Sequence, residues 1–348
     1  MVRPVIELIN RYDAGKFPKG ESYIILSSNE NPYPPAEDVL KAIERSIKKV
    51  TNRYPDPEYP ELKRAIAEYL EVDVNEIFLG NGISDCIYNI CNALLDTLDK
   101  VTIPMPSYTM YAMYSIVRDA SINYRIYPYY KIDIEDFIES VRNSKLVFLC
   151  SPNNPTGNAI PIKRIKEIVE SVRGYVALDE AYVEFSDASA IKLTDTYENL
   201  IVMRTFSKFF GLAGLRIGYG ICKDERVVSA LEKIRLPFCI NYIGAIAGVE
   251  AIKCLDYYKK IRDIIVKERE RVYRELSKFE EIEVFPSKAN FLLVKSENLR
   301  LAEKLEKRKI LVRDVTGLMG LSGEHVRITI GKPEENNALL NALEEILS

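Results

Sequence analysis

Short apolar runs alternate with segments of helical periodicity from about residue 76 to residue 222. Several of these runs are apolar throughout, as expected for strands that are buried on both faces of a sheet. Candidate helices lie between them, for example at residues 84–95 and 162–172. The alternation predicts an α/β fold in which helices flank a mostly parallel central sheet. The predicted strands are Ile77–Leu79, Val101–Ile103, Leu146–Leu149, Tyr175–Leu178, Leu200–Met203 and Ile217–Ile221.

The pattern changes after about residue 240. Residues 245–276 are helical in period and rich in charge, which predicts one long connecting helix. Short strands and helices then alternate, which predicts a smaller α+β domain. The strands are expected at 282–285, 291–294, 310–312 and 326–330, and the helices at 299–307 and 334–347.

These patterns divide the chain into three expected parts. Residues 1–45 form an N-terminal arm and part of the small domain. Residues 46–240 form the large α/β domain, and residues 241–348 form the connecting helix and the small C-terminal domain. Ligands of such sheets bind at the carboxyl ends of the strands, so the site is expected in the large domain's crevice.

Polar motifs do follow the strands of the predicted sheet. A site is therefore expected where these five strand ends meet. The motifs are Gly80–Gly82, Pro104–Tyr108, Ser151–Gly157, Asp179–Tyr182 and Thr205–Lys208, in the order of the first five predicted strands.

The segment Ser207–Arg216 carries the most specific chemistry. Lys208 can form a Schiff base with a carbonyl group, and Arg216 can bind a phosphate. The glycines between them let the backbone approach a ligand closely. Pyridoxal 5'-phosphate, an aldehyde that carries a phosphate, needs both groups. For this segment alone, a charged pair beside an ordinary surface turn explains the residues equally well.

Composition removes several classes of function. The formal net charge of −3 gives no basic field for nucleic acid, and no apolar run reaches the length of a membrane span. The N-terminus does not read as a secretory signal, so a cytoplasmic protein is expected. No cysteines form a CxxC pair and His325 is the only histidine, so we expect no metal site. Catalysis must then rely on lysine, tyrosine, carboxylates or a cofactor.

Four side chains near the strand ends suit such a cofactor. Asp179 can pair with a pyridinium nitrogen, although a turn or capping residue is the plain alternative. Asn154 and Tyr182 can reach the ring hydroxyl, and Tyr108 can stack on the ring or belong to the core. Gly80–Gly82 opens a predicted helix, whose first N–H groups can bind phosphate.

Taken in order, these residues resemble the fold-type I, pyridoxal-phosphate-dependent aminotransferases, and most closely the histidinol-phosphate aminotransferase family. The resemblance covers nearly the whole chain. The matching segments are Ser28–Tyr33, Asn52–Pro57, Ser151–Gly157, Asp179–Phe185, the block around Lys208, and Val326–Gly331.

The resemblance implies a role for each residue. Lys208 would hold the cofactor covalently and then move the proton, while Asp179 pairs with the ring nitrogen. A group of cofactor contacts would include Ile83, Ser84, Tyr108, Asn154, Tyr182, Thr205, Ser207 and Arg216. Tyr54 would reach the cofactor of a second subunit, which implies a homodimer. The substrate would be bound by Tyr12, Asn31, Arg313 and Arg327.

Several positions depart from the family pattern and leave the substrate open. The family usually has a proline before Tyr12, a serine at Ile83, a small residue at Phe209 and an asparagine at Cys239. The expected reaction is transamination between histidinol phosphate and 2-oxoglutarate in histidine biosynthesis. An aromatic amino acid aminotransferase and a decarboxylase of the threonine-phosphate type are the enzyme alternatives. A non-catalytic ligand-binding protein on the same fold is the alternative from another class.

Overall fold

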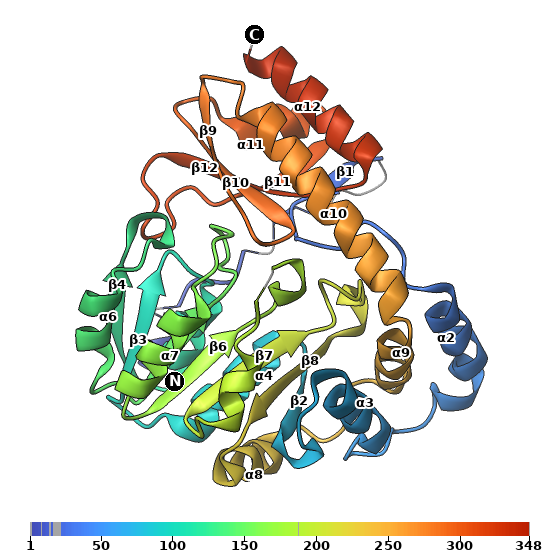
Figure 1. Cartoon of the computed structure of the whole chain (residues 1–348), viewed down its shortest axis with the longest axis vertical. Helices are drawn as coiled ribbons and strands as arrows, with labels where there is room; N and C mark the ends of the chain where they lie inside the picture. Colours follow the sequence, from blue (N-terminus) through green and yellow to red (C-terminus); the bar gives the residue numbers. More distant parts are fainter. Residues whose placement is uncertain (1, 8, 14, 17–21, 187, 348) are drawn as a thin grey trace.

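The computed structural model describes residues 2–7, 9–13, 15–16, 22–186 and 188–347. This part of the chain contains a seven-stranded sheet and a five-stranded sheet, and the smaller sheet lies above the larger one in Figure 1. The N-terminal segment adds β1 (Ile24–Leu26) to the smaller sheet, where it pairs in parallel with β11 (Ile310–Asp314). The predicted α/β class with a second α+β layer is therefore confirmed.

The seven-stranded sheet has the order β2-β8-β7-β6-β5-β3-β4. Its strands are parallel except β8, which is antiparallel to both β2 and β7. The cause is a short connection, because parallel neighbours need a crossover of a dozen or more residues. Only residues 206–216 join β7 to β8, and they include Lys208. The strands are β2 Ile77–Asn81, β3 Lys100–Met105, β4 Ser121–Ile126, β5 Leu146–Cys150, β6 Tyr175–Asp179, β7 Leu200–Thr205 and β8 Ile217–Cys222.

The edge strand β4 was not predicted. Its sequence, Ser121 to Ile126, mixes polar and apolar residues and lacks the continuous apolar run of the central strands. Most of its side chains are only half-buried, as expected at a sheet edge. The apolar pattern therefore finds the buried strands and misses this one.

Both faces of the seven-stranded sheet are covered. Along β5, Val147 and Leu149 belong to one apolar cluster and Phe148 to another, because successive side chains of a strand point to opposite faces. Ile87 of α4 packs in the second cluster and Ile165 of α7 in the first. The helices before and around this sheet are α1 Pro4–Glu7, α2 Glu37–Val50, α3 Pro60–Leu70, α4 Ile83–Leu94, α5 Met110–Val117, α6 Ile134–Val141, α7 Ile162–Ser171 and α8 Glu225–Ile234. Short 3-10 helices lie at Val74–Glu76, Pro128–Tyr130, Val183–Phe185, Ile191–Asp195 and Ala213–Leu215.

The five-stranded sheet has the order β1-β11-β12-β10-β9. Four of its strands agree closely with the predicted ones. Helices α10, α11 and α12 accompany this sheet in the upper part of Figure 1. The remaining elements are α9 Tyr242–Lys253, α10 Leu255–Leu276, β9 Ile282–Phe285, β10 Phe291–Ser296, α11 Leu301–Lys307, β12 Glu324–Thr329 and α12 Pro333–Leu347.

The connecting helix is two helices rather than the predicted one. α9 ends at Lys253, and the N–H of Cys254 donates to the carbonyls of Glu250 and Ala251 in a tightened last turn. Helix α10 begins at Leu255 and runs upward beside both sheets (Figure 1). Neither glycine nor proline marks the break, so the sequence gives no stop signal between the two helices.

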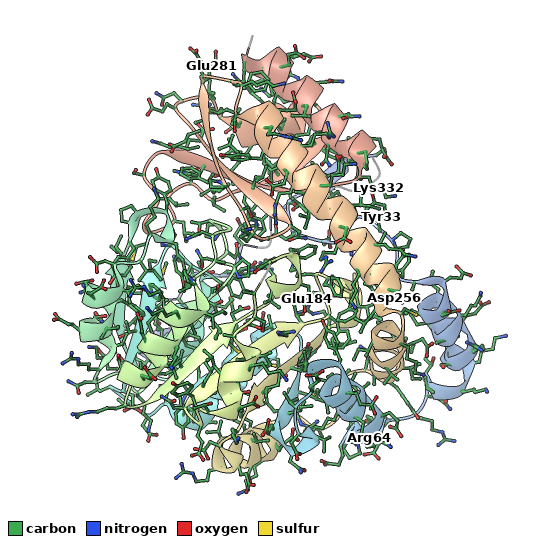
Figure 2. All side chains as sticks on the ribbon, viewed as in Figure 1. Tyr33, Arg64, Glu184, Asp256, Glu281 and Lys332 are labelled. Carbon is green, nitrogen blue, oxygen red and sulfur yellow. The ribbon has the colours of Figure 1, made fainter. Side chains whose placement is uncertain are left out.

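The segment after β1 also contacts the start of α12. The Nζ atom of Lys332 lies 5.9 Å from the ring centre of Tyr33, and both side chains lie beside α10 in Figure 2.

Within the described residues, none of the helices is both long and apolar enough to cross a membrane. The predicted boundaries at residues 45 and 240 stay predictions.

Candidate active site

A pocket of about 810 Å³ lies at the carboxyl ends of the central strands, and residues of the five-stranded sheet complete its wall. The short strand-end motifs form its floor, as the sequence pattern predicted. The structure brings most of the predicted site residues to this wall: Tyr12, Ile83, Ser84, Tyr108, Asn154, Asp179, Tyr182, Thr205, Ser207, Lys208, Arg216, Arg313 and Arg327.

Lys208 reaches the pocket from the connection between β7 and β8. Its Nζ donates a hydrogen bond to the carbonyl of Ser28 at 2.8 Å. Burial, together with the nearby guanidinium of Arg327, lowers the pKa of Lys208 to about 8. A substantial share of this amine is therefore neutral near physiological pH, which is the state that a nucleophile or a general base needs.

Asp179 ends β6 and is 4% exposed. Burial raises its pKa to about 6, and two hydrogen bonds oppose that rise. The hydroxyl of Tyr111 donates to Oδ2 at 2.6 Å, and the N–H of Ala181 donates to Oδ1 at 2.9 Å. Among the described residues this buried carboxylate has no ionic partner at hydrogen-bond distance, which suits it to pair with a positively charged ring nitrogen.

Tyr111 is a site residue that the sequence pattern did not predict. It lies on α5, stacks on Phe148 with ring centres 4.9 Å apart, and meets Tyr108 edge to face at 5.6 Å. One buried tyrosine thus contacts both the predicted ring-stacking residue and the predicted partner of the ring nitrogen, Asp179. The only sequence signal for Tyr111 as a site residue is its spacing of three residues from Tyr108. The same spacing is equally typical of a core residue.

The start of α4 forms an anion cradle. Gly82 precedes the helix with φ 77°, and the first N–H groups of a helix lack partners inside it. A Cβ atom at Gly82 would lie 2.4 Å from Nη2 of Arg216, so the glycine lets this guanidinium approach the helix. Ser207 completes the same side of the pocket, where its hydroxyl accepts from Oγ1 of Thr205 at 3.0 Å and keeps its own proton to donate. These donors fit a phosphate group.

Tyr108, Asn154 and Tyr182 line the pocket between Asp179 and the five-stranded sheet. Tyr108 and Ser84 share a hydrogen bond of 3.2 Å between their hydroxyls. Asn154 Oδ1 accepts a hydrogen bond from Arg327 at 2.6 Å, which leaves its amide N–H groups free to donate elsewhere. Two polar groups and a flat ring therefore face the space beside Asp179.

Two guanidinium groups lie side by side on the smaller sheet, because Arg313 of β11 is paired in register with Arg327 of β12. Arg327 also donates to the carbonyl of Ser27 at 2.7 Å, and its buried Nε has no hydrogen-bond partner among the described residues. Burial lowers the pKa of Arg327. Arg313 donates to the backbone of Asp13 and lies 3.4 Å from its carboxylate. This pair of cations fits an anionic group of a substrate.

Two predicted residues lie elsewhere. Asn31 does not line the pocket, because its side chain donates to the carbonyl of Phe209 and accepts from the N–H of Tyr33. Its expected contact with a substrate gains no support from this position. Tyr54 is 78% exposed and stacks on Phe238 with ring centres 4.3 Å apart, and it does not line the pocket of its own chain. Its expected role in a second subunit stays a prediction.

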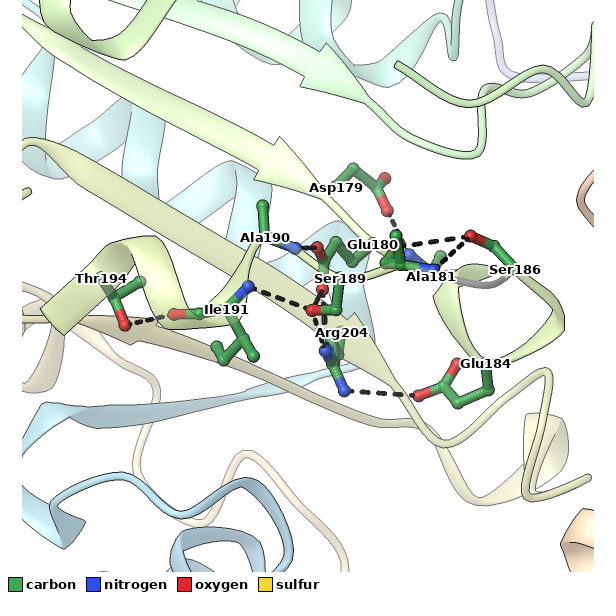
Figure 3. Close-up of polar contacts among 11 residues, drawn as sticks. Asp179, Glu180, Ala181, Glu184, Ser186, Ser189, Ala190, Ile191, Thr194 and Arg204 are labelled. Atoms are coloured by element: carbon green, nitrogen blue, oxygen red, sulfur yellow. Dashed lines mark hydrogen bonds and ion pairs between the residues drawn. The ribbon is translucent and has the colours of Figure 1, made fainter. Parts of the chain in front are cut away.

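A buried ionic cluster that the sequence pattern did not predict begins at Glu180, the residue after Asp179 (Figure 3). Arg204 of β7 donates to Oε2 of Glu180 through Nε at 3.1 Å and Nη2 at 2.8 Å. Its Nη1 lies 3.8 Å from Oε1 of Glu184. Ser189 donates a further hydrogen bond to Glu180 at 2.8 Å. Because Glu180 follows Asp179 in the chain, the cluster fixes the backbone at the end of β6.

His325, the only histidine of the sequence, makes structural contacts. It is buried on β12, shares a hydrogen bond with the carbonyl of Gly323, and lies against the rings of Tyr129 and Phe285. The described residues also contain no cluster of histidine, cysteine and carboxylate side chains that would hold a metal ion.

The residues of the pocket therefore fit pyridoxal 5'-phosphate. Lys208 supplies an amine for the aldehyde, Asp179 a carboxylate for the ring nitrogen, and the cradle at Gly82 and Arg216 the donors for a phosphate.

Comparisons with known proteins agree with this chemistry. The family model "Aminotransferase class I and II" matches residues 21–343. The chain is 49% identical to histidinol-phosphate aminotransferase 2 of Archaeoglobus fulgidus, over 99% of this chain and 100% of the relative. It is 40% identical to the histidinol-phosphate aminotransferase of Caldanaerobacter subterraneus, over 93% of each chain.

Solved structures give the same answer. The histidinol-phosphate aminotransferase of Sinorhizobium meliloti, solved in complex with pyridoxal 5'-phosphate, superposes with a TM-score of 0.88 at 27% identity and covers 99% of this chain and 96% of its own. The enzyme from Clostridium acetobutylicum gives 0.87 at 30% identity, over 93% of this chain and 98% of its own. This chain is an aminotransferase and belongs to the aminotransferase class I and II family.

Proposed function

We propose that the protein is a pyridoxal-phosphate-dependent aminotransferase that transfers an amino group between histidinol phosphate and 2-oxoglutarate. The observation that carries the proposal is the pair Arg313 and Arg327, which faces the same pocket as Lys208 and Asp179. One pair of guanidinium groups can bind the phosphate of histidinol phosphate and the carboxylate of glutamate in turn. The names of the relatives support the same substrate.

The residues that would hold the cofactor divide by the part they contact. Arg216, Thr205, Ser207 and the N–H groups of Ile83 and Ser84 would bind the phosphate. Asp179 would bind the ring nitrogen, Asn154 and Tyr182 the ring oxygen, and Tyr108 the face of the ring. Bound in this way, pyridoxal phosphate supplies an aldehyde that takes up the amino group and a ring that delocalises the negative charge left by the α-proton.

The chain itself moves the proton. When the substrate amine has taken its place, the free amine of Lys208 would remove the proton from the substrate's α-carbon. It would donate a proton again once the amino group is transferred. Its pKa of about 8 suits both tasks near neutral pH. Arg313 and Arg327 would hold the anionic end of the substrate, which fixes the α-carbon close to the lysine.

The test is a set of turnover assays with histidinol phosphate, phenylalanine and threonine phosphate. We expect histidinol phosphate to react fastest with 2-oxoglutarate. We expect none of the three substrates to release carbon dioxide. Faster reaction of phenylalanine would favour an aromatic aminotransferase, and carbon dioxide from threonine phosphate would favour a decarboxylase. Lys208→Ala should abolish the visible absorbance of the lysine-bound cofactor, while the surface variant Lys223→Ala should keep it.

We further propose a cytoplasmic homodimer in which Tyr54 reaches the cofactor phosphate of the other subunit. The support is its exposed ring, held by stacking on Phe238. A mixture of the inactive variants Tyr54→Ala and Lys208→Ala tests this arrangement. In a mixed dimer one site regains both residues, so activity should return; a mixture that exchanges subunits and stays inactive would contradict it.

A further inference from the structure

Asn29 is buried beside the pocket, and the cofactor chemistry described above does not use it. Its side chain is 0% exposed, and its backbone has the left-handed φ of 53°. It lies in the segment that follows β1, between Ser28 and Glu30, which also line the pocket. Asparagine adopts this backbone conformation more readily than most residues do, so it suits the position.

The five-stranded sheet holds Asn29 in place. Its backbone N–H donates to Oγ1 of Thr329 at 2.9 Å, and its carbonyl accepts from Nδ2 of Asn290 at 3.1 Å. The Thr329 hydroxyl also lies 3.2 Å from Oδ1 of Asn29. Both partners belong to the small sheet region, since Asn290 immediately precedes β10 and Thr329 ends β12.

These contacts determine which way the amide of Asn29 points. The Thr329 hydroxyl accepts from a backbone N–H, so its own proton is available to donate to Oδ1 of Asn29. The other end of the amide, Nδ2, then faces Tyr182 and donates to its hydroxyl oxygen at 3.0 Å. A phenol that accepts one hydrogen bond there has its single proton left to donate in another direction.

We propose that Asn29 is a positioning residue that makes the Tyr182 hydroxyl a hydrogen-bond donor toward the pocket. The inference rests on the proposed function, in which that donor meets the ring oxygen of pyridoxal phosphate. Asn29 reaches this oxygen only through Tyr182. It also ties the donor to Thr329 and Asn290, so the small sheet sets the hydrogen bonding of a residue that follows β6 of the large sheet.

The expected consequence is a shift in the titration of the bound cofactor. A donor at the ring oxygen draws electron density from that oxygen and so weakens its hold on the proton that it shares with the nitrogen of Lys208. If the donor is turned away, the proton is held more tightly and the apparent pKa of the visible absorbance rises. Besides Asn29, the charged or titratable groups that face Tyr182 are Arg327, Cys150, Asp179, Tyr108 and Lys208. All of them remain in place when Asn29 is changed.

Asn29→Asp is the sharpest test, because the two side chains have the same size and both tolerate the left-handed conformation. A carboxylate at this position accepts the Tyr182 proton instead of donating to it. We expect the absorbance pKa of the enzyme with bound pyridoxal phosphate to rise by about one pH unit. Asn123→Asp is the matched control: its amide donates to the Thr102 hydroxyl at 3.1 Å, away from the pocket, and it should leave the titration unchanged.

The double variant Asn29→Asp/Tyr182→Phe decides whether Asn29 acts through Tyr182. If it does, the double variant titrates as Tyr182→Phe does alone, because the intermediary is already lost. Shifts that add in full, or a folded Asn29→Asp protein that titrates like wild type, would overturn the inference. Failure of the part of the proposed function on which the inference rests, the binding of pyridoxal phosphate by Lys208, would look different, since wild type itself would then show no visible absorbance with the cofactor.

A second variant keeps the test open if Asn29→Asp does not fold. Thr329→Val removes the hydroxyl that orients the amide and keeps the volume of the side chain. We expect its absorbance pKa to rise in the same direction by less than that of Tyr182→Phe. An unchanged titration in folded Thr329→Val would then count against the inference, and urea unfolding of each cofactor-free variant reports whether it is folded.

Discussion

Replacement of Asp179 by asparagine is expected to stabilise the cofactor-free protein at neutral and alkaline pH. Burial raises the pKa of Asp179 from 3.8 to about 6, although the hydrogen bonds from Tyr111 and Ala181 oppose it. The folded protein therefore binds this proton more tightly than the unfolded chain does. Its stability must fall as the pH rises from about 4 to about 6, and the loss is complete above that range.

The size of the effect follows from the same shift. A rise from 3.8 to about 6 is about two pH units, and each unit corresponds to about 1.4 kcal/mol. The ionised carboxylate of Asp179 thus lowers the free energy of unfolding by about 3 kcal/mol at pH values above about 6. Asparagine cannot ionise and has the same shape, so Asp179→Asn should recover most of this amount. Near pH 4 the folded wild type carries a neutral acid, and the two proteins should differ little.

Urea unfolding of the cofactor-free proteins at about pH 4 and pH 8 measures the difference directly. Asp263→Asn, a substitution of an exposed aspartate, controls for the loss of a negative charge as such. The Asp179→Asn protein should gain about 3 kcal/mol at the higher pH while binding pyridoxal phosphate more weakly than wild type. A difference that does not change with pH, or a variant less stable than wild type at pH 8, would refute the reasoning from burial.

Three further substitutions test other contacts of the site. Tyr111→Phe keeps the ring stack and removes the hydroxyl, so the pKa of Asp179 should rise by about one further unit and move the same stability titration upward; an unmoved titration would contradict this. Gly82→Ala places a side chain at φ 77° against Arg216 and should weaken pyridoxal-phosphate binding about tenfold or more, as read by fluorescence titration. Arg313→Ala should raise the KM for histidinol phosphate about ten- to a hundredfold with cofactor affinity unchanged, in steady-state kinetics and the same binding titration.

The sequence was sufficient to locate the pocket, because the topology of a parallel sheet brings the carboxyl ends of its strands together. Each of Tyr108, Asn154, Asp179 and Lys208 lies within five residues after a recognisable apolar run, so strand pattern and chemistry coincide at these positions. The cofactor could be inferred because a lysine, an arginine and a carboxylate together fit few other small molecules.

The supporting contacts could not be predicted in this way. Asn29 bonds to Tyr182 and Thr329, which lie 153 and 300 residues away, and nothing local in the sequence marks such pairs. Tyr111 has the spacing of an ordinary core residue on a helix. The break at Cys254 could not be placed either, because neither glycine nor proline marks the residue at which α9 gives way to α10.

The short connection between β7 and β8 has a consequence for selectivity. It carries Lys208 near one end and Arg216 at the other, so a single loop of residues 206–216 sets the spacing between the amine and the guanidinium. In the proposed function, the spacing that this loop fixes must match the distance between the aldehyde and the phosphate of the ligand. Pyridoxal without its phosphate would satisfy one end only. The protein should therefore bind pyridoxal 5'-phosphate in preference to pyridoxal, because of the length of this one loop.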